Sequence, residues 1–150
     1  MERYRHTQIG WVTLTAMVAG LAVVGAALLN EEEKLVALVV FVLLLVAMVV
    51  YSSLTVTVTD EILEVRFGPG LIRRRYKLTD IKSSRIVRNH WYYGWGTRMT
   101  PHGWLYNVSG FDAVEVEFRT GKKIRVGTDE PQELGAAIHQ AAHLKGRRGH

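Results

Sequence analysis

The sequence predicts an α+β membrane protein, in which a transmembrane hairpin of two helices precedes a seven-stranded antiparallel β-barrel closed by a C-terminal helix. Three observations predict this fold class. Two long apolar segments, 9–29 and 35–53, are separated by a short acidic connection. After residue 54 the hydrophobic period changes to two, as in half-buried strands. From about residue 131 it changes again, to the spacing of an amphipathic helix.

The second apolar segment carries the membrane interpretation. Leu35 to Tyr51 are 17 residues without a charge, a proline or a glycine. A core helix is rarely apolar on every face, and a buried strand is much shorter. At about 1.5 Å of rise per residue this segment extends roughly 25 Å, and Ser52, Ser53 and Leu54 lengthen it toward the ~30 Å of a hydrocarbon layer. We expect a transmembrane helix over 35–53.

The first apolar segment, 9–29, has 21 residues without a formal charge, and Trp11 stands near its start as an interfacial aromatic would. A cleaved signal peptide is the alternative, because residues 25–27 form a small-residue stretch. The segment is long for a signal peptide, and a second span follows after only a few polar residues. We therefore favour an antiparallel hairpin, preceded by a short polar head.

Small residues in the first span predict close helix packing. Ala16 and Gly20 are four residues apart, as are Ala22 and Ala26, and this spacing lets helix backbones approach closely. The partner would be the second helix or another copy of the chain, although glycine and alanine are also simply common in membrane helices. Neither span contains an ionisable residue, which argues against transport.

The charge distribution predicts an orientation. Sixteen of the 19 Lys and Arg residues and ten of the 14 Asp and Glu residues follow residue 54, so this part has a net charge of +6. The connection 30–34 contains a single Lys, and the positive-inside rule therefore places both termini in the cytoplasm. Positive charge close to a bilayer favours anionic lipid headgroups over nucleic acid.

The absence of cysteine excludes disulfides and thiolate chemistry.

The region 54–145 is predicted to form one domain of seven strands and a helix. Alternating β-branched or aromatic residues indicate the strands, and Gly-containing pairs and triplets indicate the turns between them. The helix would begin after Thr128 or Asp129, with an apolar stripe that needs a sheet to pack against and with a basic tail, 146–150, after it. The expected strands cover 54–59, 63–67, 71–78, 81–88, 104–108, 114–118 and 123–126. The stripe comprises Leu134, Ala137, Ile138, Ala141 and Leu144.

Four segments of this region carry recognisable motifs: GWGTR at 94–98, GWLYNVSGFDAVEVEF at 103–118, GKKIRVGT at 121–128 and DEPQEL at 129–134. With the order of elements, they resemble the bacterial pleckstrin-homology (PH) domain family, which often follows two membrane spans. The resemblance covers about 54–144 and implies a PH-like fold at the bacterial inner membrane, without a catalytic residue. It does not imply phosphoinositide binding, because the turn Asp60-Glu61 has the wrong charge for it.

Two surfaces are candidates for binding. A cationic cluster would contact anionic headgroups or an acidic protein partner, or would be a solvated strand that discourages edge pairing or fixes topology. It comprises Arg73, Arg74, Arg75 and Lys77. The glycine-rich loop 90–103 carries aromatic residues and an arginine of the kinds that anchor interfaces. These are Trp91, Tyr92, Tyr93, Trp95 and Arg98, which could also contact the membrane or pack on Trp104.

The sequence predicts no catalytic, metal or cofactor site. His139 and His143 share a helix face without a third ligand nearby, and there is no phosphate-binding glycine loop. We therefore expect a binding module, not an enzyme, that is anchored in the membrane and docks a protein partner or anionic lipid. The alternative is an assembly subunit whose hairpin drives formation of a homo-oligomer or a membrane complex.

Overall fold

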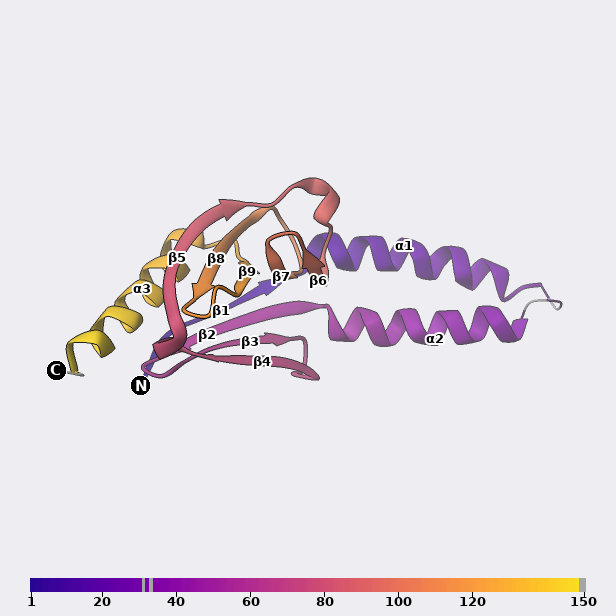
Figure 1. Cartoon of the computed structure of the whole chain (residues 1–150). Helices are drawn as coiled ribbons and strands as arrows, with labels where there is room; N and C mark the ends of the chain where they lie inside the picture. The colour runs from indigo at the N-terminus through magenta and orange to yellow at the C-terminus, as the bar shows by residue number, and fades with distance from the viewer. Residues whose placement is uncertain (31, 33, 149–150) are drawn as a thin grey trace.

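Two β-sheets and a C-terminal helix form the body of the protein, and a helical hairpin extends from one end of it (Figure 1). This computed structural model describes residues 1–30, 32 and 34–148, with side chains through residue 143. The elements are β1 (Glu2–Ile9), α1 (Trp11–Ala27), α2 (Lys34–Val50), β2 (Ser53–Thr59), β3 (Ile62–Phe67), β4 (Ile72–Lys77), η1 (Leu78–Asp80), β5 (Ile81–Arg88), η2 (Trp91–Tyr93), β6 (Gly96–Thr100), β7 (Gly103–Asn107), β8 (Asp112–Phe118), β9 (Lys123–Gly127) and α3 (Pro131–Arg148).

The predicted transmembrane hairpin is wrong. Among the described residues, none of the helices combines the length and the apolar character needed to cross a membrane. Spans were expected over 9–29 and 35–53, but α1 and α2 have 17 residues each. Such a helix rises about 26 Å, against the ~30 Å of a hydrocarbon layer. The integral membrane partner, the inner-membrane location with cytoplasmic termini and the lipid contact all depended on these spans and are withdrawn with them.

Strand β1 explains why the first helix is short. Residues 2–9, expected to be a polar head and the start of a span, pair antiparallel with β2, from Glu2 opposite Thr59 to Ile9 opposite Ser53. The backbone of Ile9 is therefore held in a sheet, and α1 begins only at Trp11. The helical hairpin is thus an insertion between two strands that are neighbours in one sheet.

The nine strands of the described part of the chain form two sheets, in the orders β1-β2-β3-β4 and β5-β8-β9-β7-β6. The predicted closed, purely antiparallel seven-stranded barrel is wrong in three respects. β1 and β6 are additional strands, the sheets are separate, and β7 pairs with β9 in parallel. β6 lies inside the predicted glycine-rich loop, where its sequence GTRMT lacks a clear alternation. Strands β4 and β6 each pair with one neighbour and so form open edges of their sheets.

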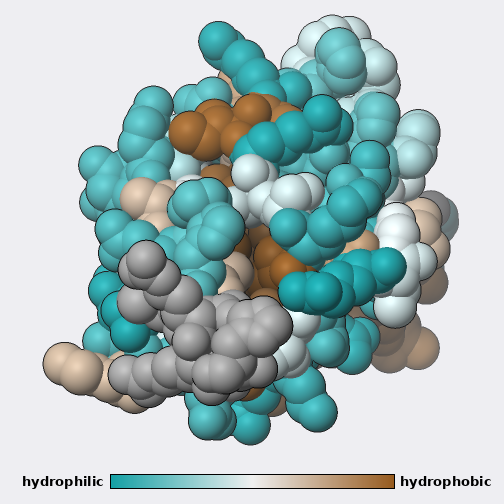
Figure 2. All heavy atoms as spheres, turned by 60° about the vertical axis from the view of Figure 1, so that its left-hand side comes forward, coloured by the Kyte–Doolittle hydropathy of each residue, from teal (hydrophilic) through white to brown (hydrophobic). Residues whose placement is uncertain are grey.

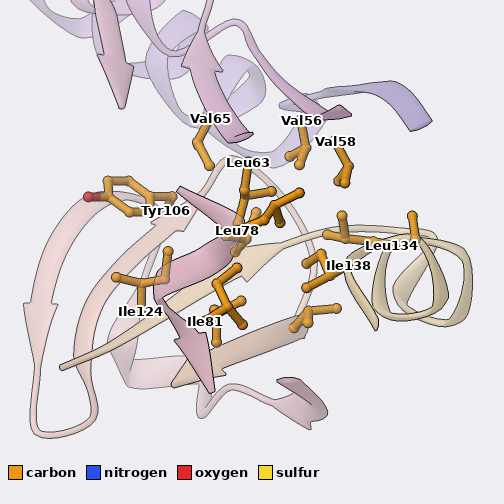
Figure 3. Close-up of a cluster of buried hydrophobic side chains, with 14 of the residues drawn as sticks. Val56, Val58, Leu63, Val65, Leu78, Ile81, Tyr106, Ile124, Leu134 and Ile138 are labelled. Atoms are coloured by element: carbon orange, nitrogen blue, oxygen red, sulfur yellow. The ribbon is translucent and has the colours of Figure 1, made fainter. Parts of the chain in front are cut away.

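The core lies between the two sheets and is closed by α3. Buried aliphatic side chains from β2, β3, η1, β5 and β9 point toward one another, and α3 covers them (Figure 3). Leu134 and Ile138 of α3 are fully buried there, which stabilises the body by about 1.5–3 kcal/mol for each side chain. Just before α3 the Thr128 hydroxyl accepts a hydrogen bond from the Glu130 N–H, as in a Ser/Thr turn. Leu144 and the basic tail lie outside the described side chains.

Candidate functional site

The α1–α2 hairpin exposes most of its apolar side chains. None of the residues of α1 is buried, and α2 buries only Ala37 and Val50. By contrast, the face of the body seen in Figure 2 is mainly hydrophilic. The largest apolar patch of an ordinary monomer covers about 300–600 Å² and is often functional. The hairpin is therefore the first candidate for an interaction site.

The predicted packing residues of α1 do not act together. A Cβ atom at Gly20 would lie 3.8 Å from Leu44 Cδ1, and one at Gly25 would lie 3.8 Å from Phe41 Cε2. Both distances are ordinary van der Waals contacts, so the two glycines face α2 within one chain, but the packing of the helices does not require glycine at either position. Three other predicted residues, Ala16, Ala22 and Ala26, are exposed, as is Ala19. Gly20 thus belongs to the contact inside the hairpin, and the alanines belong to its outer surface.

The outer surfaces of the two helices differ in shape. On α1, the exposed alanines form a low surface between scattered valines such as Val18 and Val23. On α2 the exposed residues are nearly all large, because leucine and valine occupy its outer positions. Examples are Leu35, Val39, Val42, Leu43, Val46 and Val49. One helix therefore offers shallow positions, and the other offers large side chains that could fill them.

The base of the hairpin is tightly fixed to the body. The Gly10 N–H donates to the Ser52 carbonyl at 2.8 Å, and the Thr13 hydroxyl donates to the Val108 carbonyl at 2.6 Å. A Cβ atom at Gly10 would lie 2.9 Å from the Tyr51 carbonyl oxygen, so this crossing needs glycine. The hairpin thus has a defined direction relative to the sheets.

The predicted cationic cluster lies on the edge strand β4 and is divided between its two faces. Arg73 and Arg75 share a face and lie 3.7 Å and 2.5 Å from the carboxylate of Glu64. In the register of the sheet, Arg74 stands opposite Val65, on the face that carries the buried residues of β3. Lys77 is exposed at the end of the strand. The four cations therefore do not form one surface.

The predicted aromatic residues do lie close together, around η2. Tyr92 stacks on His90 with ring centres 5.0 Å apart and meets Tyr93 edge-on at 4.9 Å. Trp91 is 76% exposed. Trp95 is half-buried near Phe111, and the guanidinium of Arg98 lies beside Gly94.

A buried ion pair on the second sheet was missed. Glu115 and Arg125 alternate with apolar residues along their strands, a pattern that predicts an outward, solvent-facing position, but they are 2% and 6% exposed. The Glu115 carboxylate accepts hydrogen bonds from Arg125 Nε at 2.8 Å and from Arg85 Nε at 2.9 Å. Burial alone would raise the pKa of Glu115, but the hydrogen bonds from the two arginines outweigh burial and hold it below its ordinary value. The only signal in the sequence for this ion pair was that residues of opposite charge, Glu115 and Arg125, lie in successive strands that could pair.

The histidine pair on α3 has no further ligand. The Nε2 atoms of His139 and His143 lie 2.9 Å apart, but the described residues contain no group of three potential metal ligands. No protein-family model, curated protein or solved structure matches this chain. The resemblance to the bacterial PH domain family therefore rests on its motifs alone and stays a prediction.

Proposed function

We propose that this protein is an assembly module that associates with a second copy of itself through the α1–α2 hairpin. The observation that carries the proposal is the apolar surface of a hairpin in which α1 buries no residue and α2 buries two. Of the two functions expected from the sequence, this is the assembly alternative, here without a membrane. It accounts for the most unusual surface of the described chain.

Shape supports a second copy as the partner. In a pair related by a two-fold axis, the alanines of α1 in each chain would face the large side chains of α2 in the other. The same contact then occurs twice, as a symmetric dimer requires. The product is a four-helix bundle, in which small residues on one helix accept large residues from its neighbour.

Charge also supports an apolar partner. α1 carries no charged residue, and α2 carries one, Lys34 at its first position. A charged partner surface would lose its hydration against these helices without gaining an ion pair. A second hairpin of the same composition avoids that cost.

The burial energy that the hairpin offers is of the size that association requires. Complete burial of an exposed valine or leucine contributes about 1.5–3 kcal/mol, so a half-exposed one contributes roughly half of that. Six such side chains from each chain would then contribute on the order of 10 kcal/mol or more. This is comparable to the roughly 4–15 kcal/mol that association costs in lost freedom of motion.

Sedimentation of the full chain, with and without one substitution, tests the proposal. We expect the wild type to dimerise and Leu43→Ser, on the outer surface of α2, to raise the dimer dissociation constant at least tenfold. Leu71→Ser is the matched control, because Leu71, 73% exposed against 62% for Leu43, is also a largely exposed leucine and lies in a turn of the body. A wild type that is monomeric in buffer, or that is retained only by phospholipid vesicles, would overturn the proposal, as would equal effects of the two substitutions.

Crosslinking then tests the arrangement of the helices. The chain contains no cysteine, so single introduced thiols report one contact each. We expect a bismaleimide to join Ala19→Cys in one chain to Leu43→Cys in another, since α1 should face α2 between copies. Crosslinking at the same yield to a cysteine at Leu71 would contradict this arrangement.

A further inference from the structure

We propose that the hollow between edge strand β4 and the strands β6 and β7 is a binding site for a phosphate monoester. The hollow has a volume of about 360 Å³ and lies on the open side of the sandwich, where the two sheets do not pair. Its lining comes from both sheets and from the turn after β8, and none of it comes from the hairpin. The inference therefore does not depend on the proposed assembly function.

The charge of the lining selects an anion. Arg74, Arg75 and Lys122 line the hollow, and no carboxylate does. Arg75 is neutralised by Glu64 from outside, at 2.5 Å. Among the described residues, neither Arg74 nor Lys122 has a carboxylate within ion-pair distance. Two uncompensated positive charges match a phosphate monoester, which carries about −1.5 to −2 at neutral pH, better than they match a single carboxylate.

Hydroxyl groups supply donors for the phosphate oxygens. The hydroxyls of Tyr76 and Tyr106 lie 2.6 Å apart, so one donates to the other and the second hydrogen is free to donate elsewhere. Burial, and then the hydrogen bond to Tyr106, raise the pKa of Tyr76 well above its ordinary value, so Tyr76 stays neutral. Both residues line the hollow.

A third hydroxyl lacks any partner. The Oγ1 atom of Thr97 is buried and makes no hydrogen bond, although Thr97 also lines the hollow. A buried hydroxyl without a partner is unfavourable, and rotation of the Thr97 side chain toward the hollow would let an anion oxygen accept its hydrogen. This unsatisfied group is an indication of a ligand that is independent of the cations.

Aromatic walls limit the shape of the ligand. Trp104 lines the hollow beside the two tyrosines, and Lys122 Nζ lies over the Tyr76 ring at 6.0 Å. The hollow is in the range of small-molecule sites, so it has room for a planar group next to the phosphate. An adjoining hollow shares Arg75, Tyr76 and Lys122 but is also lined by the acidic Asp80, so it suits an anion less well.

Calorimetric titration of the full chain tests the site with inorganic phosphate, adenosine monophosphate and adenosine. We expect both phosphates to bind and adenosine not to bind, with affinity rising as the pH increases through the second phosphate pKa near about 6. Tighter binding of the monophosphate than of inorganic phosphate would place the ring against Trp104. Equal affinities of inorganic phosphate and adenosine monophosphate would show that the phosphate group alone accounts for binding, which also supports a phosphate site.

Substitutions connect the binding to the named residues. Arg74→Gln and Lys122→Gln should each weaken phosphate binding at least tenfold, and Thr97→Val should weaken it about threefold to tenfold without lowering stability. Arg73→Gln is the matched control on the opposite face of β4 and should change affinity less than twofold. Absence of phosphate binding at millimolar concentration, equal binding of adenosine, or an equal loss in Arg73→Gln would overturn the proposal.

Discussion

The hairpin and the body are both rich in leucine and valine, but they differ in what covers these side chains. In the body, Leu63 is 0% exposed between two sheets and α3, whereas Leu43 of the hairpin is 62% exposed. The body thus completes its own core, and the hairpin does not. Apolar composition therefore identifies the segments that need a packing partner, and the topology decides whether another part of the same chain buries them.

The largest expected effect comes from removing a covered side chain. Leu63→Ala should lower the free energy of unfolding of the body by about 4 kcal/mol, because a close-packed core collapses only partly around a deleted side chain. Urea unfolding followed by circular dichroism measures the change. A loss below about 1 kcal/mol would mean that the body is not packed as its buried residues indicate.

The junction between the two regions should give a smaller effect. Gly68 has φ +47°, and a Cβ atom there would lie 2.5 Å from the Val49 carbonyl oxygen at the end of α2. Gly68→Ala should therefore cost about 2–3 kcal/mol, from the left-handed backbone and the collision together. Gly121→Ala is the control, since φ is +86° there but nothing lies within 4 Å of the added carbon. Equal losses of stability in Gly68→Ala and Gly121→Ala would show that the end of α2 can move away from an added carbon at residue 68.

Acidification should lower the stability of the body but leave association through the hairpin unchanged, because only the body depends on buried charges. The pKa of Glu115 is lower in the folded body than in the unfolded chain, so its contribution is present above the unfolded pKa and is lost as the pH falls through the folded value. Unfolding by urea should become easier below about pH 4. Dimerisation through the uncharged hairpin faces should stay constant between about pH 5 and 8, where Glu115 remains ionised.

Glu115→Gln provides the control for this pH dependence. The variant should be less stable at neutral pH, because Arg125 stays buried without its carboxylate, but its stability should change less on acidification. Identical pH profiles for wild type and variant would assign the acid sensitivity to other groups. Asp60 is one such group, since hydrogen bonds from the Met1 amino group and then from Arg3 lower its pKa.

The smallest effect is expected from the exposed counterpart of Leu63. Leu43→Ala should change the unfolding free energy of the body by less than about 0.5 kcal/mol, because an exposed side chain loses little on truncation. The measurement is the same urea titration, made at a protein concentration where the chain is monomeric. A loss comparable to that of Leu63→Ala would mean that the hairpin is part of the core after all.

Local patterns were sufficient for much of the body. β2, β5 and β8 were expected close to their observed bounds. In β2 and β8 the reason is that alternating β-branched residues favour a half-buried strand in any context. β1 was missed because its inward positions, Tyr4, His6 and Gln8, are polar or amphipathic. Their partners are supplied by other elements: the Tyr4 hydroxyl, for instance, donates to the Glu130 carboxylate at 3.1 Å.

The membrane prediction and the candidate sites show where local reasoning stops. The apolar length of residues 9–29 was read without knowing that Ile9 is paired with Ser53. In the same way, Arg74 and Lys122 are 48 positions apart and acquire a common role only when β4 faces β7. The aromatic cluster was found because its members are consecutive in the sequence. Sites built by tertiary contacts leave no such local pattern.

The insertion of the hairpin between β1 and β2 has a consequence for how such a chain can change in evolution. Because the backbone of Gly10 is already bonded to that of Ser52, the two strands meet at the spacing of a tight turn, whatever lies between them. The part of the hairpin between Thr13 and Val49 can therefore be lengthened by whole helical turns, or exchanged for a different segment, without altering the register of either strand. The fold of the body can therefore stay the same while the sequence and length of the inserted segment change.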